Sequence, residues 1–504
     1  MTRHSILLAA LSALALAAPL GVGLAADKVD LAESILPPPA PPSEALRPFV
    51  KVPAGQLALT NVRIIDGTGG PALAGRTLLI DGGKIAGIQA ATDALPAGYR
   101  TVDGRGLSVL PGIVGMHDHQ YYIARPNLDD DGHSDSPLVI PQMTFSSPRM
   151  YLANGVTTLR TTGSVEPYTD LNLKQAIDAG KMPGPHMDVT GPYLEGPNSS
   201  FIQMHQLRDA DDATRTVNFW ADQGVTSFKA YMNITRDQLK AAIDAAHARG
   251  LKLTGHLCSV TYAEAAAMGI DDLEHGFVVN TQNDPGKTPD LCPKTVGDPT
   301  LTGMDPASDD ARALIATLIK HRVAVTSTLP VFEPWSPTYR KLPPNQLAML
   351  NPSARTDYLR LFKLRAKRKP EAVAAKIKAW RNALGLERAF VAAGGLLIAG
   401  PDPTGRGDVL PGFGNHRAIE LLVEAGFSPV EAIKIATLNG ATYIGLADRI
   451  GSIQTGKNAD LLLVRGDPSS DITAIRNVVT VFKDGTGYNP DALLASARGR
   501  YGQY

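Results

Sequence analysis

The fold can be read outward from one stretch of the sequence, Gly112-Ile113-Val114-Gly115-Met116-His117-Asp118-His119. Its apolar start indicates a buried β-strand, and strand side chains two residues apart point to the same face. His117 and His119 can therefore direct both imidazoles to one point at the carboxyl end of the strand. Neutral imidazole is a good ligand for zinc and similar divalent ions. The stretch predicts a metal-ligand pair, although two unrelated histidines at a strand end would give the same pattern.

The size and charge of the chain exclude several classes of partner. Its 504 residues suffice for one large domain and a smaller one. Apolar residues make up 44% and charged residues 19%, which is typical of globular proteins. Basic and acidic residues are equal at 49 each, so no excess charge suggests a nucleic-acid partner or an anionic membrane surface.

The N-terminus has the features of a secretory signal peptide over residues 1–26. Arg3 precedes an apolar, Ala-rich run over residues 6–24, and small residues follow at Ala25 and Ala26. The alternative is a membrane anchor, because the run approaches the length that spans a bilayer. Its composition and its small-residue end favour cleavage. We therefore expect an exported protein, periplasmic or secreted, without a stable membrane anchor.

The segments on either side of the central region have compositions of their own. Residues 27–54 are rich in proline and predict an extended linker rather than a packed element. Residues 55–108 contain short strand patterns broken by Asp-Gly and Gly-Gly turns, which indicates a small antiparallel unit. Further strand patterns occur after the central region. We expect residues 55–108 and 448–490 to form one small β-sandwich domain from both flanks.

Residues 109–447 alternate short apolar strands with helical patterns. The predicted strands cover residues 113–117, 156–160, 187–190, 226–230, 252–255, 272–274, 323–328 and 396–399. Eight strand–helix repeats predict an α/β fold, a (β/α)8 TIM-type barrel. The alternative, an open doubly wound sheet, lacks its usual Gly-x-Gly-x-x-Gly fingerprint here. An insertion near residues 330–390 contains two helical patterns and could cover a substrate.

Polar residues at the strand ends form a candidate site, because chemistry on such a barrel sits at the carboxyl ends of its strands. The residues found there are His117 and His119 on the first strand, Lys229 on the fourth, His256 on the fifth, His275 on the sixth and Asp402 on the eighth. Four imidazoles, one amine and one carboxylate are therefore expected to converge.

Three further motifs carry a family resemblance. They are residues 453–460 (Ile-Gln-Thr-Gly-Lys-Asn-Ala-Asp), residues 481–485 (Val-Phe-Lys-Asp-Gly) and the segment from Gly426 to Ala441. With them and the strand-end residues, nearly the whole mature chain resembles the metal-dependent amidohydrolase superfamily. The pattern is most similar to its binuclear, prolidase-like branch, which is related to imidazolonepropionases and includes enzymes that cleave dipeptides and N-acyl amino acids.

The resemblance implies two divalent metal ions, with zinc as the expected element. His117 and His119 match ligands of the first ion. Lys229 matches a lysine that is carboxylated in binuclear members and bridges the two ions. His256 and His275 match ligands of the second ion.

Asp402 matches the aspartate that binds the first ion and a bridging hydroxide, and that shuttles the proton. Two ions can polarise a carbonyl and activate a shared water, and a nearby carboxylate can pass the proton to the leaving amine. Two positions depart from the family pattern. Pro401 replaces the common Ser or Thr before this aspartate, and Thr161 replaces the acidic residue that often follows the arginine at position 160.

These features predict an exported metallohydrolase that cleaves amide or peptide C–N bonds of a small-molecule or dipeptide substrate. A mononuclear deaminase or a cyclic-imide or lactone hydrolase of the same superfamily is the alternative enzyme, but such members usually lack the lysine. A non-catalytic scaffold would have lost ligands, and none of the six is lost. Whether the chain forms a homo-oligomer is left open.

Four residues outside the ligand set also have expected roles. Tyr231 lies two residues beyond Lys229 and faces the same side, and His205 follows the third strand, so both are candidate substrate contacts. Cys258 and Cys292 could pair or both be free. Because they follow the fifth and sixth strands, which are neighbours in a barrel, a disulfide between them is plausible.

Overall fold

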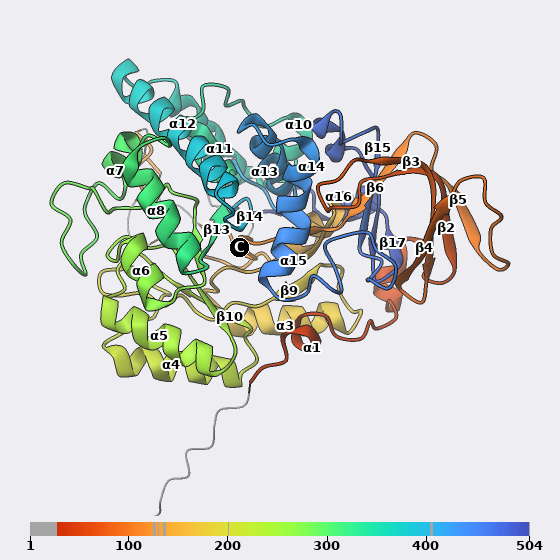
Figure 1. Cartoon of the computed structure of the whole chain (residues 1–504), viewed down its shortest axis with the longest axis horizontal. Coiled ribbons are helices and arrows are strands. Elements are labelled where there is room, and N and C mark those ends of the chain that lie inside the picture. The colour runs from red at the N-terminus through yellow and green to blue at the C-terminus, as the bar shows by residue number, and fades with distance from the viewer. Residues whose placement is uncertain are drawn as a thin grey trace, which may run out of the picture.

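The computed structural model describes residues 28–123, 128–129, 131–134, 138–199, 201–403 and 407–502. The predicted signal peptide lies outside this range. A large α/β unit occupies the left of Figure 1, and a smaller unit made of strands lies against its right side.

The small unit is one nine-stranded sheet in the order β1-β17-β16-β15-β6-β2-β3-β4, with β5 paired to β2. Its strands are β1 (Val50–Val52), β2 (Leu57–Ile64), β3 (Leu73–Asp81), β4 (Lys84–Ala90), β5 (Arg100–Asp103), β6 (Leu107–Pro111), β15 (Leu461–Arg465), β16 (Val478–Lys483) and β17 (Thr486–Tyr488). Antiparallel pairing of β6 with β15 joins the two flanks of the large unit. The chain leaves this sheet after β6 and returns to it at β15.

Strand β15 contributes side chains to two hydrophobic cores, because successive side chains on a strand point to opposite faces. Leu461 and Leu463 belong to the core of the small unit, together with Phe482 of β16. Leu462 and Val464 belong to the core of the large unit. Burying each of these side chains contributes about 1.5–3 kcal/mol, so the strand stabilises both units against each other.

The large unit is built on eight parallel strands. They are β7 (Ile113–Gly115), β8 (Val156–Arg160), β9 (His186–Asp188), β10 (Ser227–Ala230), β11 (Lys252–Gly255), β12 (Asp272–Glu274), β13 (Ala324–Ser327) and β14 (Leu397–Ala399). Each strand pattern predicted from the sequence contains or overlaps one of them. All their residues are buried except the half-buried Lys252, and several of the buried ones are polar or charged, among them Arg160, Lys229 and Glu274.

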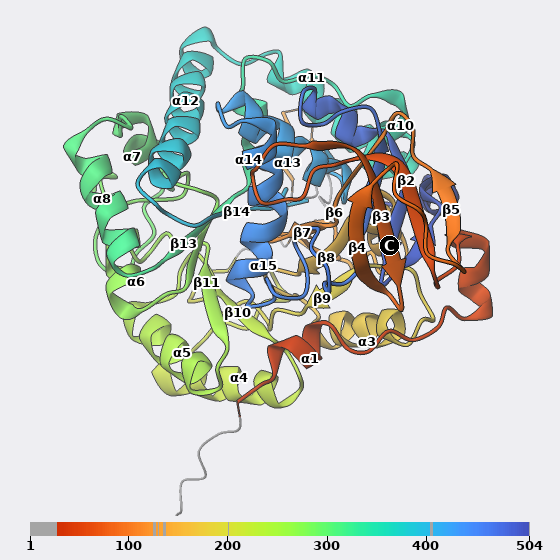
Figure 2. The ribbon, with the colours of Figure 1, turned by 45° about the vertical axis from the view of Figure 1, so that its right-hand side comes forward.

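The eight strands form two sheets, β7-β8-β9 and β10-β11-β12-β13-β14, rather than one continuous ladder. Isolated bridges between Thr190 and Ser227 and between Leu194 and Ala230 join the segment of β9 to β10. On the other side, the Met116 amide donates to the Ala399 carbonyl over 2.9 Å. The strands therefore follow one another in chain order around a centre, as Figure 2 shows, while the closed barrel expected from the sequence is interrupted at two places.

Helices surround the strands. They are α2 (Ser146–Ala153), α3 (Pro167–Asp178), α4 (Ala210–Asp222), α5 (Arg236–Ala248), α6 (Tyr262–Met268), α7 (Asp298–Gly303), α8 (Asp309–Lys320), α13 (Phe413–Glu424), α14 (Pro429–Lys434) and α15 (Gly440–Tyr443), with α16 (Pro490–Ala497) near the C-terminus. Local sequence sets several starts: Thr235 and Gln238 form a capping box on α5, and Thr261 and Glu264 form one on α6.

The predicted insertion follows β13. It holds α9 (Leu329–Phe332), a 3-10 turn over Glu333–Trp335, α10 (Pro344–Leu347), α11 (Pro352–Arg365) and α12 (Pro370–Ala392). The two longer helices coincide with the helical patterns in the sequence. Within the described part of the chain, no helix has both the length and the apolarity to cross a membrane.

The proline-rich segment is packed, so the expectation of a free linker is wrong for its described part. It contains α1 (Leu31–Ile35) and a 3-10 helix over Glu44–Phe49, and it runs beneath α3 in Figure 2. Ile35 and Leu36 are buried, and the Arg449 guanidinium donates to the carbonyl of Leu36 over 3.1 Å. The apolar residues Ile35 and Leu36, directly before the prolines, provide the surface that docks, and the proline content gave no sign of this.

Cys258 and Cys292 form a disulfide, with their Cα atoms 4.9 Å apart. The sequence left open whether the two cysteines pair, and the structure shows that they do. The bond ties the loop after β11 to the loop after β12, across 34 positions of sequence.

Replacing both cysteines, Cys258→Ser with Cys292→Ser, should lower the free energy of unfolding by about 3–4 kcal/mol, because the reduced chain regains the entropy of a loop of this length. Urea unfolding followed by circular dichroism measures the change. A reducing agent should weaken the wild-type protein to the same level and leave the double variant unchanged. Equal stability of variant and wild type would contradict the expected contribution.

Candidate metal centre

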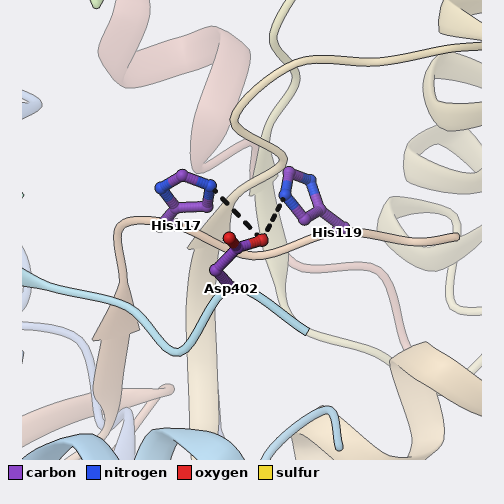
Figure 3. A group of neighbouring side chains, drawn as sticks. All are labelled: His117, His119 and Asp402. Carbon is purple, nitrogen blue, oxygen red and sulfur yellow. Dashed lines mark hydrogen bonds and ion pairs between the residues drawn. The ribbon is translucent and has the colours of Figure 1, made fainter. Parts of the chain in front are cut away.

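Three predicted ligands converge between the ends of two strands. His117 and His119 follow β7, and Asp402 follows β14 (Figure 3). Oδ1 of Asp402 lies 3.1 Å from Nε2 of His119 and 3.6 Å from Nε2 of His117. One donor atom from each residue falls within 4.8 Å of the others, a spacing that could hold a metal ion.

The other three predicted ligands surround this group. Nζ of Lys229 lies 3.3 Å from Nε2 of His117, and Nδ1 of His275 lies 3.8 Å from Oδ2 of Asp402. The rings of His256 and His275 are 4.3 Å apart between centroids. The structure thus brings all six residues into one cluster, in which His256 is partly exposed and the rest are buried.

Two of the residues reach the cluster through left-handed backbone. His275 has φ of +68° and Asp402 has φ of +53°. Glu274 already points inward on β12, so an extended His275 would point away from the centre. The left-handed conformation turns it inward instead. Such conformations are unfavourable for residues with a side chain, and they cluster at functional sites.

The join between β14 and β7 requires glycine. A Cβ atom on Gly400 would lie 2.2 Å from the backbone nitrogen of His117. The close approach allows the amide of Asp402 to donate to the carbonyl of His117 over 3.0 Å. The two strand ends that carry the His-His-Asp group are therefore fixed directly to each other.

A buried carboxylate orients His117. Nδ1 of His117 donates to Oε2 of Glu274 over 2.6 Å, which leaves Nε2 with its lone pair facing the cluster. Glu274 is held in turn by Arg160 at 2.9 Å and by the hydroxyl of Thr254 at 2.6 Å. Nδ1 of His119 similarly donates to the carbonyl of Thr161 over 3.0 Å.

Sequence reasoning missed the role of Glu274. The signal was present: Asp272 and Glu274 are two residues apart on a buried strand, so both carboxylates face the interior and need a partner. Arg160 supplies it, donating to Asp272 over 2.8 Å as well.

Burial keeps the imidazoles neutral. It lowers the pKa of His256 to about 3 and that of His117 well below its ordinary value, with the charge of Lys229 adding to the effect on His117. Burial also lowers the pKa of Lys229 to about 8. Although burial alone would raise the pKa of Asp402, the attraction of His117 and His119 lowers it to about 2. The cluster is thus a carboxylate among neutral imidazoles, which is a donor set for divalent metal ions.

A buried nitrogen of His275 without a hydrogen-bond partner also supports a metal-binding role for the cluster. Nε2 of His275 is buried and has no hydrogen-bond partner among the described residues, whereas Nδ1 lies 2.9 Å from the hydroxyl of Thr328. Buried polar atoms are rarely left without a partner, and an unpaired imidazole nitrogen of this kind is suited to be a metal ligand.

Aromatic side chains contact the cluster. The ring of Tyr121 stacks on His119 with centroids 4.3 Å apart, and its hydroxyl lies 2.5 Å from that of Tyr193. The ring of Tyr231 is 5.0 Å from that of His256, beside the predicted ligands. Phe332, at the end of α9 in the insertion, lies 5.7 Å from the ring of His275.

His205 lies elsewhere. Its side chain is 52% exposed, and its Nε2 is 3.1 Å from Oδ2 of Asp212. It lines a surface hollow with Met204 and Trp220 that also reaches Tyr193, and no contact with the six clustered residues is found in the described structure.

Comparisons with known proteins agree with this geometry. Residues 402–487 match the model of the amidohydrolase family. The fold superimposes on a Xaa-Pro dipeptidase with bound methionine in its active site (TM-score 0.64, 20% identity, covering 86% of this chain and 100% of the other). It also superimposes on ochratoxinase from A. niger (TM-score 0.61, 16% identity, 86% and 95% covered) and on a bottromycin amidohydrolase (TM-score 0.64, 20% identity, 88% and 90% covered).

Curated relatives match over short segments. Adenine deaminase from Ruegeria sp. (strain TM1040) is 44% identical over 48 residues, and imidazolonepropionase from Desulfotalea psychrophila (strain LSv54 / DSM 12343) is 38% identical over 61 residues. These matches cover 10% and 12% of this chain, and they span only 8% and 15% of the two relatives. The sequence match to the amidohydrolase family therefore covers residues 402–487, and the solved structures share the fold of this chain.

Glu274→Gln should weaken metal binding about 10- to 100-fold, because the neutral amide no longer fixes the ring of His117 or its tautomer. Competition with a coloured chelator measures the affinity. Glu387→Gln is the matched control, since Glu387 is equally buried but bonds Ser327 over 2.9 Å instead of a cluster residue. Unchanged affinity in Glu274→Gln, with the fold verified by circular dichroism, would remove Glu274 from the ligand-orienting role.

Proposed function

We propose that the protein is a metal-dependent hydrolase that cleaves amide or peptide C–N bonds, with dipeptides or N-acyl amino acids as substrates. One observation carries the proposal: four neutral imidazoles, Asp402 and Lys229 meet in one mostly buried cluster beyond the carboxyl ends of the central strands. The fold shared with a Xaa-Pro dipeptidase supports the reaction class. We also infer that the eight strands act as one (β/α)8 barrel and that the small sheet folds as a β-sandwich.

The cluster has enough donors for two divalent ions, and zinc suits its mixture of nitrogen and oxygen. His117, His119 and Asp402 would hold one ion, and His256 and His275 the other, with Lys229 between them. When bound, such ions supply a Lewis acid for the substrate carbonyl and an activated water.

Lys229 is suited to become the bridging anion. It is buried, its pKa is lowered to about 8, and no carboxylate lies within ion-pair distance of it in the described residues. A fraction of roughly a tenth is therefore the neutral amine at pH 7. The amine nitrogen can add to carbon dioxide and release a proton, which yields a carbamate whose single negative charge is shared by two oxygens. That group offsets the repulsion of two cations.

Asp402 is placed to move the proton. Its Oδ1 lies at the centre of the group formed with His117 and His119, and its lowered pKa keeps it an ionised acceptor. The carboxylate can take the proton of the attacking water and deliver it to the nitrogen of the leaving amine. The left-handed backbone at Asp402 fixes its direction.

The aromatic walls favour substrates with an apolar part. Tyr193 contacts the ring of Tyr231 and the hydroxyl of Tyr121, and Phe332 from the insertion contacts the ring of Trp335. Tyrosine hydroxyls can orient a substrate by hydrogen bonds while the rings exclude water. Tyr231 is therefore the proposed substrate contact. His205 is exposed and lies away from the cluster, so we no longer propose that it contacts the substrate directly.

A mononuclear deaminase or cyclic-imide hydrolase is the second candidate, because short segments match adenine deaminase and imidazolonepropionase. The position of Lys229 between the two groups of imidazoles favours the binuclear hydrolase. We further propose that residues 1–26 direct export. The disulfide supports this, because such bonds persist in oxidising compartments.

A substrate panel separates the candidates. Purified protein loaded with zinc should hydrolyse dipeptides or N-acyl amino acids with apolar side chains. It should be much slower on adenine, cyclic imides and lactones. Release of free amino acid, measured by chromatography, is the readout. Activity on adenine or a cyclic imide alone would replace the proposed function with the second candidate.

Lys229→Ala should lose most of one metal equivalent and lower kcat/KM at least about a thousandfold, equivalent to roughly 4 kcal/mol of transition-state stabilisation. Metal analysis and single-substrate kinetics measure both effects. Short carboxylic acids should restore part of the activity by replacing the bridge. Lys252→Ala is the control, because Lys252 is a partly buried lysine on β11 that bonds the carbonyl of Tyr443. Two bound ions and full turnover in Lys229→Ala would refute the bridging role.

A further inference from the structure

A second group of metal-type donors lies at the opposite end of the central strands. His186 is the first residue of β9, whereas the candidate metal centre lies beyond the carboxyl ends. Asp460 directly precedes β15, and Asp484 directly follows β16. One donor atom from each residue lies within 4.8 Å of the other two. Three segments far apart in the sequence, two of them from the small unit, thus contribute one ligand-type atom each.

Several of these donor atoms are buried without a partner. His186 is 3% exposed, and neither of its ring nitrogens makes a hydrogen bond to any described residue. Asp460 is 5% exposed, and its Oδ2 is also unpaired, while its Oδ1 accepts from the amide of Asp484 over 2.7 Å. Buried polar atoms are rarely left without a partner, so this group of donor atoms requires an explanation.

An ion pair explains only part of the arrangement. Nε2 of His186 lies 3.1 Å from Oδ2 of Asp484, within range of a charge interaction. That contact leaves Nδ1 of His186 and Oδ2 of Asp460 without partners. Lys483 and Lys84 also interact electrostatically with Asp484, but the ammonium of Lys84 is bound 2.6 Å from the amide oxygen of Asn458.

A cavity adjoins the donors. It has a volume of about 290 Å³ and is lined by His186, Asp484, Lys483, Asp178 and the proline-rich segment at residues 37–42. It has room for several water molecules, which could complete a coordination shell. The backbone of Asp484 is left-handed, with φ of +50°, and this conformation turns its carboxylate toward His186.

We propose that His186, Asp460 and Asp484 form a second metal site, which takes one divalent first-row transition ion, with zinc as the best fit. One imidazole nitrogen, two carboxylate oxygens and one water from the cavity give the four-coordinate shell that zinc prefers. Two carboxylates balance the charge of the ion. The site joins β9 of the large unit to both β15 and β16 of the small unit, so its role is structural.

The stoichiometry of bound zinc in the full-length protein tests this site. After equilibration with buffered zinc and removal of the excess, His186→Asn and Asp484→Asn should each bind one ion fewer per chain than the wild type. Both variants should hydrolyse substrate at the wild-type rate at 25 °C and should unfold at a lower temperature.

His416→Asn is the matched control. His416 is also buried, but its Nε2 donates to the carbonyl of Asn154 over 2.7 Å. Its loss should lower stability without changing the zinc content. If His186→Asn and Asp484→Asn both retain the wild-type zinc content, the three residues form an ion-pair cluster only.

Crystals of the zinc-loaded wild type provide a test that does not depend on a variant folding. Anomalous scattering at the zinc edge should give a peak between His186, Asp460 and Asp484. A map with peaks at the candidate metal centre and none here would overturn the proposal and leave the proposed function intact.

Discussion

The buried guanidinium of Arg160 is the constraint on which the candidate metal centre depends. It is 1% exposed and donates to Asp272, to Glu274 and to the carbonyl of Met116. A buried charge is tolerated only when nearly all of its hydrogen-bonding capacity is used. Arg160 therefore fixes β8, β12 and the end of β7 relative to one another. Arg160 also holds Glu274, which in turn orients the ring of His117. The guanidinium of Arg160 thus determines, by way of Glu274, the orientation of a candidate metal ligand.

The strand ends above this network are held with little freedom. A side chain at Gly400 would collide with the backbone of His117, so β14 and β7 can approach only with glycine at this position. His275 and Asp402 have left-handed backbone, which the surrounding hydrogen bonds hold in place. Strain of this kind persists only where the surrounding structure determines it. A site that must place six donor groups around a point needs this rigidity, because small errors in direction weaken coordination. The strand ladder is interrupted between β9 and β10 and at the β14–β7 join, where a few backbone hydrogen bonds replace a continuous ladder.

Much of this could be predicted because it follows from periodicity. Apolar runs bounded by polar residues located all eight strands, and chain order around a barrel then brought His117, Lys229 and Asp402 to one end. The order of strands did not reveal which residues orient the ligands, because that depends on side-chain contacts between β8 and β12. The packing of residues 28–49 was missed because composition reports backbone preference and not the surface available for docking. The pairing of Cys258 with Cys292 was left open because spacing along the chain does not fix the distance in space.

The two ends of the central strands differ in what their buried polar groups do. At the carboxyl ends, neutral imidazoles and an ionised Asp402 lie beside aromatic rings, with Tyr121 stacked on His119 and Phe332 in contact with His275. At the amino end, His186 faces two carboxylates of the small unit. The adjoining cavity, which the proline-rich segment helps to line, has room for water. Since β15 seals both cores and begins directly after Asp460, a ligand that fixes this aspartate also fixes the strand that joins the units. Stability can therefore be strengthened at one end without changing the geometry that the chemistry requires at the other.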